Sequence, residues 1–201
     1  MATTDAVLPA IEQVIDHKRP PKVLPPAVFL MNPKFPHNVG AALRACSCWG
    51  INQLWWTGQR VNLELEKGQR LPREERMKGY RDVQLFNDDR PFDRLADEGI
   101  EPSDGVTPVA VELLPSSENL ANFEHPEKAI YVFGPEDGSI NQVIRRLCHR
   151  FVFIPTHHCL NLAAAINVVL YDRSFKLGQA GMYSNTEEAL KEYRGPVWAQ
   201  D

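Results

Sequence analysis

Three short segments of the sequence carry side chains that could form an active site together. They are residues 38–44 (NVGAALR), 133–139 (FGPEDGS) and 154–165 (IPTHHCLNLAAA). Each lies at a junction between a predicted strand and a predicted helix, and in open α/β sheets ligands bind at the carboxyl ends of the strands. The segments supply a guanidinium, a carboxylate, a carboxamide and several glycines. We therefore expect one polar site built from all three.

Each segment offers a different contact to a ligand. Arg44 lies just over one helical turn after Gly40 and could bind a phosphate or carboxylate with two hydrogen bonds, or pair with a nearby acid on the surface. Gly40 and Gly134 could let a ligand approach the backbone, and a tight turn would expose Glu136. Asn161 could offer a donor and an acceptor to a ligand, or simply cap the helix that follows.

Two other chemistries remain open in the third segment. Residues 148–149 (CH) and 157–159 (HHC) could bind a metal together, although their spacing matches none of the usual zinc patterns. Cys159, near a predicted helix start, could act as a nucleophile with His157 or His158. The glycines of 133–139 match neither a P-loop nor a dinucleotide fingerprint, so the common ATP and NAD sites are not predicted.

The composition predicts an ordinary globular protein. The chain has 201 residues, of which 43% are hydrophobic and 24% charged, which suits one domain with a sizeable core. No apolar run could span a bilayer, and the N-terminus lacks a signal-peptide pattern, so a cytoplasmic protein with reduced cysteines is expected. The net charge of −4 argues weakly against nucleic acid. Residues 59–81 are nevertheless locally basic, as a phosphate-binding surface or a solvated helix face would be.

Predicted strands alternate with predicted helices along the chain. The strands are expected at 27–32, 53–57, 83–86, 106–113, 129–133 and 151–154, and the helices at 38–49, 73–78, 93–97, 139–148, 160–177 and 186–193. This alternation predicts an α/β fold with a mostly parallel sheet covered by helices on both faces. Asn38 is expected to cap the first helix, and Ser139 with Gln142 to form a capping box.

The same pattern predicts the organisation of the chain. Residues 1–26 end in proline-rich sequence and are expected to form a mobile or surface-draped arm. Residues 27–178 are expected to form a single domain, and 179–201 a C-terminal tail.

Taken together, the three segments resemble the SpoU (TrmH-like) RNA ribose 2′-O-methyltransferases of the SPOUT superfamily. The matching residues are Asn38, Gly40 and Arg44 in the first motif; Phe133, Gly134, Glu136 and Gly138 in the second; and Ile154, Pro155, Leu160, Asn161, Leu162, Ala163 and Ala165 in the third. The resemblance covers about residues 27–177. Cys159 departs from it, because the family usually has serine at that position.

The resemblance implies a fold that ordinary topology rules would not suggest, a C-terminal deep trefoil knot. It implies a homodimer in which Arg44 reaches a site shared with the partner subunit and the apolar face of the 160–177 helix contributes to the interface. It implies that S-adenosylmethionine (AdoMet) binds against the knot loops, without a metal. The cofactor-binding residues would be Val111, Gly134, Ile154, Cys159 and Leu160, and the catalytic residues Arg44, Glu136, Asn161 and Asn38.

The implied function is AdoMet-dependent methylation of a ribose 2′-hydroxyl in RNA. We expect tRNA as the substrate, because many ribosomal-RNA members of the family carry an added N-terminal domain and residues 1–26 are too short for one. Ribosomal RNA remains an alternative. A non-catalytic RNA- or nucleotide-binding knotted module, suggested by Cys159 in place of serine, and a Cys159-dependent hydrolase are further alternatives.

Overall fold

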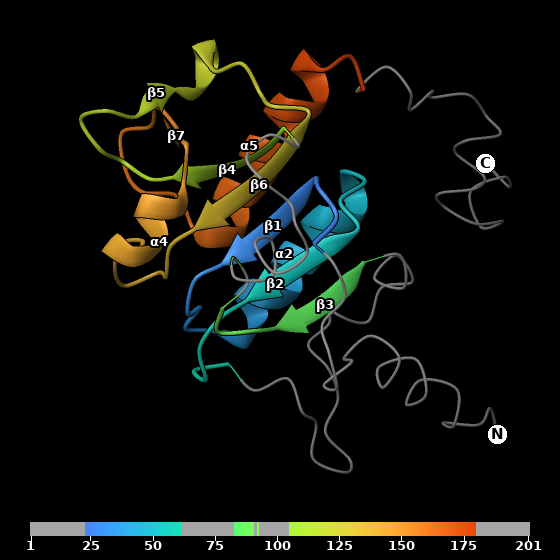
Figure 1. The fold of residues 1–201 in the computed structure, drawn as a ribbon, viewed down its shortest axis with the longest axis vertical. Coiled ribbons are helices and arrows are strands. Elements are labelled where there is room, and N and C mark those ends of the chain that lie inside the picture. Colours follow the sequence, from blue (N-terminus) through green and yellow to red (C-terminus); the bar gives the residue numbers. More distant parts are fainter. Residues whose placement is uncertain (1–22, 62–82, 91, 93–104, 180–201) are drawn as a thin grey trace, which may run out of the picture.

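The described residues form a seven-stranded sheet in which every neighbouring pair of strands is parallel (Figure 1). The structure is a computed structural model that describes residues 23–61, 83–90, 92 and 105–179. The strand order is β3-β2-β1-β6-β4-β7-β5. In chain order the strands are β1 (Ala27–Leu30), β2 (Gln53–Trp56), β3 (Gln84–Asn87), β4 (Val106–Val111), β5 (Glu118–Asn119), β6 (Lys128–Phe133) and β7 (Arg150–Phe153).

Helices cover both faces of this sheet, as predicted. They are α2 (Pro36–Cys48), α4 (Gln142–Leu147) and α5 (Leu162–Lys176), with a short 3-10 helix, η5 (Leu120–Asn122). α2 and α5 pack together against one face, over Val28 and Tyr131, whereas Ile144 of α4 packs against the other face with Phe29 and Ile130. The central strands are apolar at successive positions because both of their faces are buried. No helix in the described ranges has the length and apolarity to cross a membrane.

Two predicted helix starts are wrong. α2 begins at Pro36 with Phe35 as its N-cap, since the fixed φ of proline suits the first helical position. Asn38 therefore lies inside the first turn and is buried, so it does not cap the helix. α4 is capped by Asn141, whose Oδ1 accepts a hydrogen bond from the Ile144 amide at 2.9 Å, and not by Ser139.

The predictions for Gly40 and for several segments of the chain are not tested by the described structure. Gly40 is buried within α2 and does not line the pocket described below, so its role of leaving room for a ligand stays a prediction. The helices predicted at 73–78, 93–97 and 186–193 lie outside the described residues, as does most of the basic segment 59–81.

The order of the last strands departs from their order in the chain. β7 lies between β4 and β5, although residues 112–117 join β4 directly to β5. Val152 of β7 pairs with Val111 on one side and with Glu118 on the other. The 112–117 link therefore passes across the carboxyl end of β7, next to the point where the chain leaves that strand towards α5.

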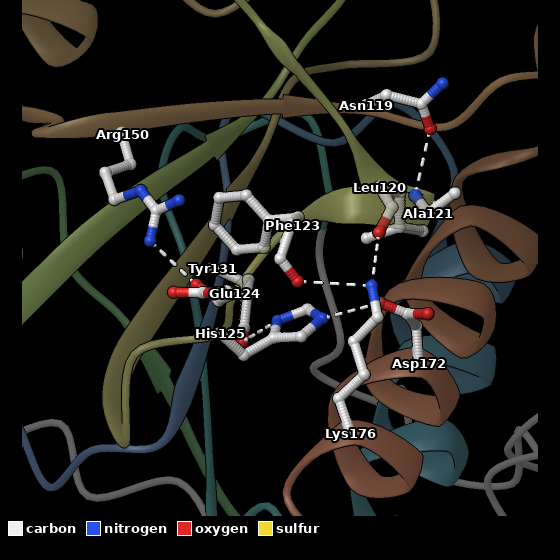
Figure 2. A network of polar contacts seen from close by, with 10 residues as sticks. All are labelled: Asn119, Leu120, Ala121, Phe123, Glu124, His125, Tyr131, Arg150, Asp172 and Lys176. Atoms are coloured by element: carbon white, nitrogen blue, oxygen red, sulfur yellow. Dashed lines mark hydrogen bonds and ion pairs between the residues drawn. The ribbon is translucent and has the colours of Figure 1, made fainter.

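A buried histidine network holds α5 against the segment that follows η5 (Figure 2). The two ring nitrogens of His125 contact the Tyr131 hydroxyl at 2.7 Å and Asp172 Oδ2 at 2.8 Å. Lys176 pairs with Asp172 at 2.7 Å and donates to the carbonyl oxygens of Leu120 and Phe123. These contacts fix the C-terminal half of α5, while the opposite end of the helix points at the candidate site.

Candidate active site

The three sequence segments meet in one hydrogen-bonded network of side chains. Asn161 Nδ2 donates to Asn38 Oδ1 at 3.1 Å, and Asn38 Nδ2 donates to Glu136 Oε1 at 2.5 Å. The three residues come from the N-cap of α5, the first turn of α2 and the loop after β6. We call this group the amide–carboxylate network (Asn161, Asn38 and Glu136). The structure thus brings together three of the four predicted catalytic residues.

Helix capping orients one end of this network. Asn161 Oδ1 accepts hydrogen bonds from the backbone amides of Ala163 and Ala164, at 2.9 and 3.4 Å. This use of the oxygen leaves the amide nitrogen of Asn161 to donate to Asn38. The two interpretations of Asn161, helix cap and site residue, are therefore compatible, because one carboxamide does both.

Backbone contacts fix the other end of the network at Glu136. Its Oε2 accepts a hydrogen bond from the Lys34 amide at 2.8 Å. Partial burial acts to raise the pKa of Glu136, but the hydrogen bonds from Asn38 and from the backbone of Lys34 and Phe35 together lower it below its ordinary value. The Glu136 carboxylate is therefore ionised at neutral pH and fixed in orientation by donors from two segments.

A pocket of about 550 Å³ lies beside this network, at the carboxyl ends of β4, β6 and β7. This is the edge of an open α/β sheet at which ligands bind. Glu136 lines the pocket, and so do all five residues predicted to bind a cofactor: Val111, Gly134, Ile154, Cys159 and Leu160. Sequence segments more than 40 residues apart thus contribute to one concave surface.

The loop leaves little room for a side chain at position 134. A Cβ atom at this position would lie 3.1 Å from the Ile140 nitrogen and 3.3 Å from the carbonyl carbon of Ser139. The same Ile140 amide donates to Glu112 Oε2 at 2.9 Å. Glu112 also lines the pocket and was not predicted as a site residue. Its place directly after β4, at the carboxyl end of a strand, is the sequence signal that could have identified it.

A cluster of ion pairs borders the network on the surface. Arg60 binds both carboxylate oxygens of Asp137, at 3.0 and 2.8 Å, and Lys34 Nζ lies 3.3 Å from Asp137 Oδ2. The hydrogen bond from Arg60, with further help from Lys34, lowers the pKa of Asp137 to about 2. Arg60 is the one basic residue of segment 59–81 that the structure describes, and it binds an acid of this protein.

Arg44 does not reach the pocket within one chain. It lies exposed on α2, it does not line the pocket, and its side chain has no partner among the residues that the structure describes. No acidic side chain among the described residues pairs with Arg44, so this part of the chain does not support the alternative of a surface ion pair. A guanidinium in this position is available to contact another molecule.

The metal and nucleophile alternatives gain little from the geometry. Cys148 and His149 precede β7, whereas 157–159 follow it, so the strand separates the two groups. Within the described ranges, no cluster of histidine, cysteine and carboxylate side chains could hold a metal ion. Cys159, His157 and His158 all line the pocket, but no hydrogen bond joins Cys159 to either histidine in this part of the chain. Cys159 also lies two residues before the N-cap of α5.

The family comparison decides between these interpretations. The model of the SpoU rRNA methylase family matches residues 25–171 of the sequence. The chain belongs to this family. The resemblance inferred from the three motifs is therefore confirmed, and the protein is a SpoU-family RNA methyltransferase. A search of curated proteins finds no match to the sequence.

Solved SpoU-family structures share the fold. The TrmH/SpoU tRNA modifying enzyme of A. aeolicus superposes with a TM-score of 0.63 at 22% identity, over 83% of this chain and 84% of that chain. The SpoU methyltransferase AviRb of Streptomyces viridochromogenes, solved in complex with AdoMet, gives 0.63 at 18% identity, over 75% of this chain and 60% of AviRb. A structure that describes 2-OH methylation of C/U34 on tRNA gives 0.59 at 20% identity, over 76% and 95% of the two chains.

Proposed function

We propose that this SpoU-family protein transfers the methyl group of AdoMet to a ribose 2′-hydroxyl of RNA, and that its substrate is a tRNA. The observation that carries the proposal is the pocket at the carboxyl ends of β4, β6 and β7, with the amide–carboxylate network at its side. Two of the similar structures are tRNA-modifying proteins, and this chain spans 84% and 95% of their lengths. Ribosomal RNA is the second candidate, because the family description names it.

The pocket suits AdoMet in size and lining. Its volume of about 550 Å³ lies within the roughly 300–1,000 Å³ typical of small-molecule sites. Apolar side chains such as Val111 and Leu162 could cover an adenosine, while the loop backbone at Gly134 and Leu160 and the Glu112 carboxylate could meet polar groups. AviRb was solved with AdoMet bound. We therefore assign cofactor binding to Val111, Gly134, Ile154, Cys159 and Leu160.

The chain's own residues would position the substrate and assist loss of its proton. Bound AdoMet supplies a methyl group already activated by the positive charge on sulfur, so the protein must mainly align the ribose with it. Glu136, Asn38 and Asn161 hold the pocket wall in one shape. The guanidinium of Arg44 would hold the target phosphate with two hydrogen bonds. A phosphate oxygen of the RNA would then accept the hydroxyl proton.

Arg44 would reach the site from a second copy of the chain. Arg44 has no partner within the described residues and lies away from the pocket of its own subunit. The exposed surface of α5 offers an interface, since Val168, Tyr171 and Phe175 are exposed there and Tyr171 contacts the rings of Trp49 and Phe175. Apolar and aromatic side chains of this kind are enriched in homodimer interfaces.

The strand order supports the predicted knot. Because the 112–117 link crosses the carboxyl end of β7, the chain that leaves β7 would pass through the loop that this link closes. We assign the knotted domain to residues 27–178, with 1–26 as an arm and 179–201 as a tail. The threaded segment would then contain the third motif.

The test is methyl transfer from labelled AdoMet to unmodified tRNA and, in a separate reaction, unmodified ribosomal RNA. We expect label in tRNA. Label in ribosomal RNA alone would move the substrate to the second candidate, and label in neither would contradict the proposal.

Arg44→Ala tests the assigned role of the arginine in the same assay. Transfer should fall by at least about a thousandfold, because the phosphate contact is made in the transition state. Calorimetry with the demethylated cofactor should show nearly unchanged affinity. Arg146→Ala, which removes an exposed arginine of α4, is the matched control and should behave like wild type. Lost cofactor binding in a folded Arg44→Ala protein would refute the role.

A further inference from the structure

An exposed aromatic pair lies next to Glu136 and has no part in the core. The rings of Phe35 and His37 are stacked, with centroids 5.3 Å apart and planes 19° from parallel. Phe35 is 41% exposed, and His37 is exposed as well. Aromatic side chains left in solvent at the border of a pocket can receive a flat ligand group.

The backbone holds this pair in a fixed place relative to the pocket. Phe35 is the N-cap of α2 and Pro36 is its first residue, so the backbone between the two rings is restricted. The preceding residue, Lys34, donates its amide to Glu136, which lines the pocket. A group stacked on the pair would therefore be held at a set distance from a group in the pocket.

We propose that Phe35 and His37 form a stacking platform for a nucleobase of the RNA substrate, close to the nucleotide that is methylated. This inference rests on the proposed function and names residues that bind its substrate. Every nucleobase has an aromatic face, so such a platform binds RNA with little sequence preference. The Lys34 ammonium lies 5.3 Å from the Phe35 ring centroid and is paired with Asp137, so it leaves stacking as the contact that this pair offers.

The local charges favour stacking over electrostatic attraction as the source of affinity. Lys34 and Arg60 both pair with Asp137, and Glu136 adds a second carboxylate that acts electrostatically on Arg60. The whole protein carries a net charge of −4. Contacts other than charge attraction must therefore contribute to binding an anionic RNA, and base stacking is the strongest of these in single-stranded nucleic acid complexes.

The surroundings also favour a base over a protein partner. Interface centres between proteins are depleted of charged residues. The Phe35–His37 pair is bordered by Lys34, Asp137 and Arg60, whereas the apolar residues of α5 are the better protein-binding surface. A protein partner at the platform would instead be revealed by a change of oligomeric state in the Phe35→Ala variant.

The experiment measures binding of a short single-stranded oligoribonucleotide of mixed sequence that contains 2-aminopurine, whose fluorescence is quenched by stacking. Titrations contain the demethylated cofactor. Phe35→Ala should weaken binding by roughly 5- to 150-fold and abolish the quenching at saturation, because one stacked base is lost. Phe35→Trp should retain both, whereas Phe35→Leu, which keeps apolar bulk without an aromatic face, should behave like Phe35→Ala. Val143→Ala, at an exposed site on α4, is the control.

Every outcome bears on the platform or on the proposed function separately. RNA affinity unchanged in folded Phe35→Ala, or no RNA binding by the wild type, would overturn the platform. A change of oligomeric state in Phe35→Ala with RNA affinity intact would also overturn it and assign the ring to a protein interface. If the wild type transfers methyl groups and Phe35→Ala leaves RNA affinity unchanged, the platform is overturned and the proposed function stands. If oligonucleotide binding depends on Phe35 but the wild type transfers no methyl group, the platform is supported and the proposed function is contradicted.

Discussion

Asn38 joins the three motifs because its carboxamide uses both of its ends. It donates to Glu136 and accepts from Asn161 while being almost fully buried. A buried carboxamide satisfied on both sides stabilises one arrangement of its neighbours, since any other arrangement leaves a polar atom unpaired. The motif asparagine thus acts by fixing its neighbours, and it does not contact the pocket directly.

Asn38→Asp should destabilise the protein most at neutral pH. The substitution replaces the donor to Glu136 with a carboxylate oxygen, so two anions face each other in a partly buried site. We expect a loss of about 1–3 kcal/mol in the free energy of unfolding at pH 7. The loss should shrink towards pH 4, because protonation of either carboxyl group restores a donor.

Urea unfolding of wild type and variant at both pH values makes this measurement. Asn122→Asp, at an exposed position at the end of η5, is a matched control that should show a small and nearly constant effect. An equal loss at the two pH values would contradict the contact between Asn38 and an ionised Glu136.

The surroundings of several single residues could not be predicted from local sequence patterns. Proline at the first helical position moved the start of α2 to Pro36, ahead of the asparagine taken as its cap. Asn38 could then be buried, which no local capping rule predicts. Gly134 lines the pocket, as predicted. The lack of room for a side chain there comes from Ile140 of the same loop, a contact that depends on the folded path of the loop. Glu112 was missed because a lone carboxylate after a strand has no motif.

At the scale of elements, α5 is anchored at both ends by polar contacts. Its N-terminus carries Asn161 of the amide–carboxylate network, and its C-terminal half is held by His125 through Asp172. Burial lowers the pKa of His125, and this outweighs the opposing effect of Asp172. The neutral imidazole is therefore the form favoured by folding. Its contribution is present above the ordinary pKa of 6.5 and is lost as the pH falls through the lowered value in the folded state.

His125→Phe should remove this pH dependence as well as two hydrogen bonds. We expect a loss of about 1–3 kcal/mol in the free energy of unfolding at pH 7.5, because the buried Tyr131 hydroxyl loses its hydrogen bond to His125. The difference from wild type should narrow towards pH 5, where protonation of His125 already disfavours the folded wild type. Thermal or urea unfolding across this range measures it, with His149→Phe at an exposed position as the control. A difference that widens towards pH 5 would show that the folded state prefers the protonated imidazole.

The strands that are buried on both faces of the sheet could be predicted from the sequence. Residues 27–30 and 129–133 are apolar at successive positions, and both runs lie in central strands as expected. β5 has two residues and η5 has three, which is too short for a sequence pattern. The position of β7 between β4 and β5 could not be derived from residue patterns, because strand order depends on long-range pairing.

At the scale of the whole molecule, the proposed site needs two copies of the chain. The pocket and the amide–carboxylate network belong to one subunit, whereas Arg44 lies outside that pocket. Among the residues that the structure describes, no side chain pairs with Arg44, and in the proposal its contact is made in the site of a second copy. The motif spacing predicts a functional role for Arg44 but contains no information on which copy's pocket it would serve.

Mixing two inactive variants tests this sharing. Arg44→Ala and Glu136→Gln proteins should each be inactive in methyl transfer. Mixed dimers should regain activity, because one pocket then combines an intact Glu136 with an intact Arg44 from the partner. Purified mixed dimers should show about half of the wild-type rate, because one of their two sites is intact. Co-expression with two affinity tags, followed by purification of mixed dimers and a labelled-methyl assay, provides the measurement. Mixed dimers as inactive as the parents would place Arg44 and Glu136 in the same subunit's site.

The position of the transferred methyl group tests the central claim most directly. RNA methylated by the wild type with labelled AdoMet is divided, and one part is digested to nucleosides while the other is hydrolysed with alkali. A pocket that presents a ribose hydroxyl to AdoMet predicts label in a single 2′-O-methylated nucleoside and in an alkali-resistant dinucleotide. Label on a nucleobase, or no label in any RNA offered, would contradict the account.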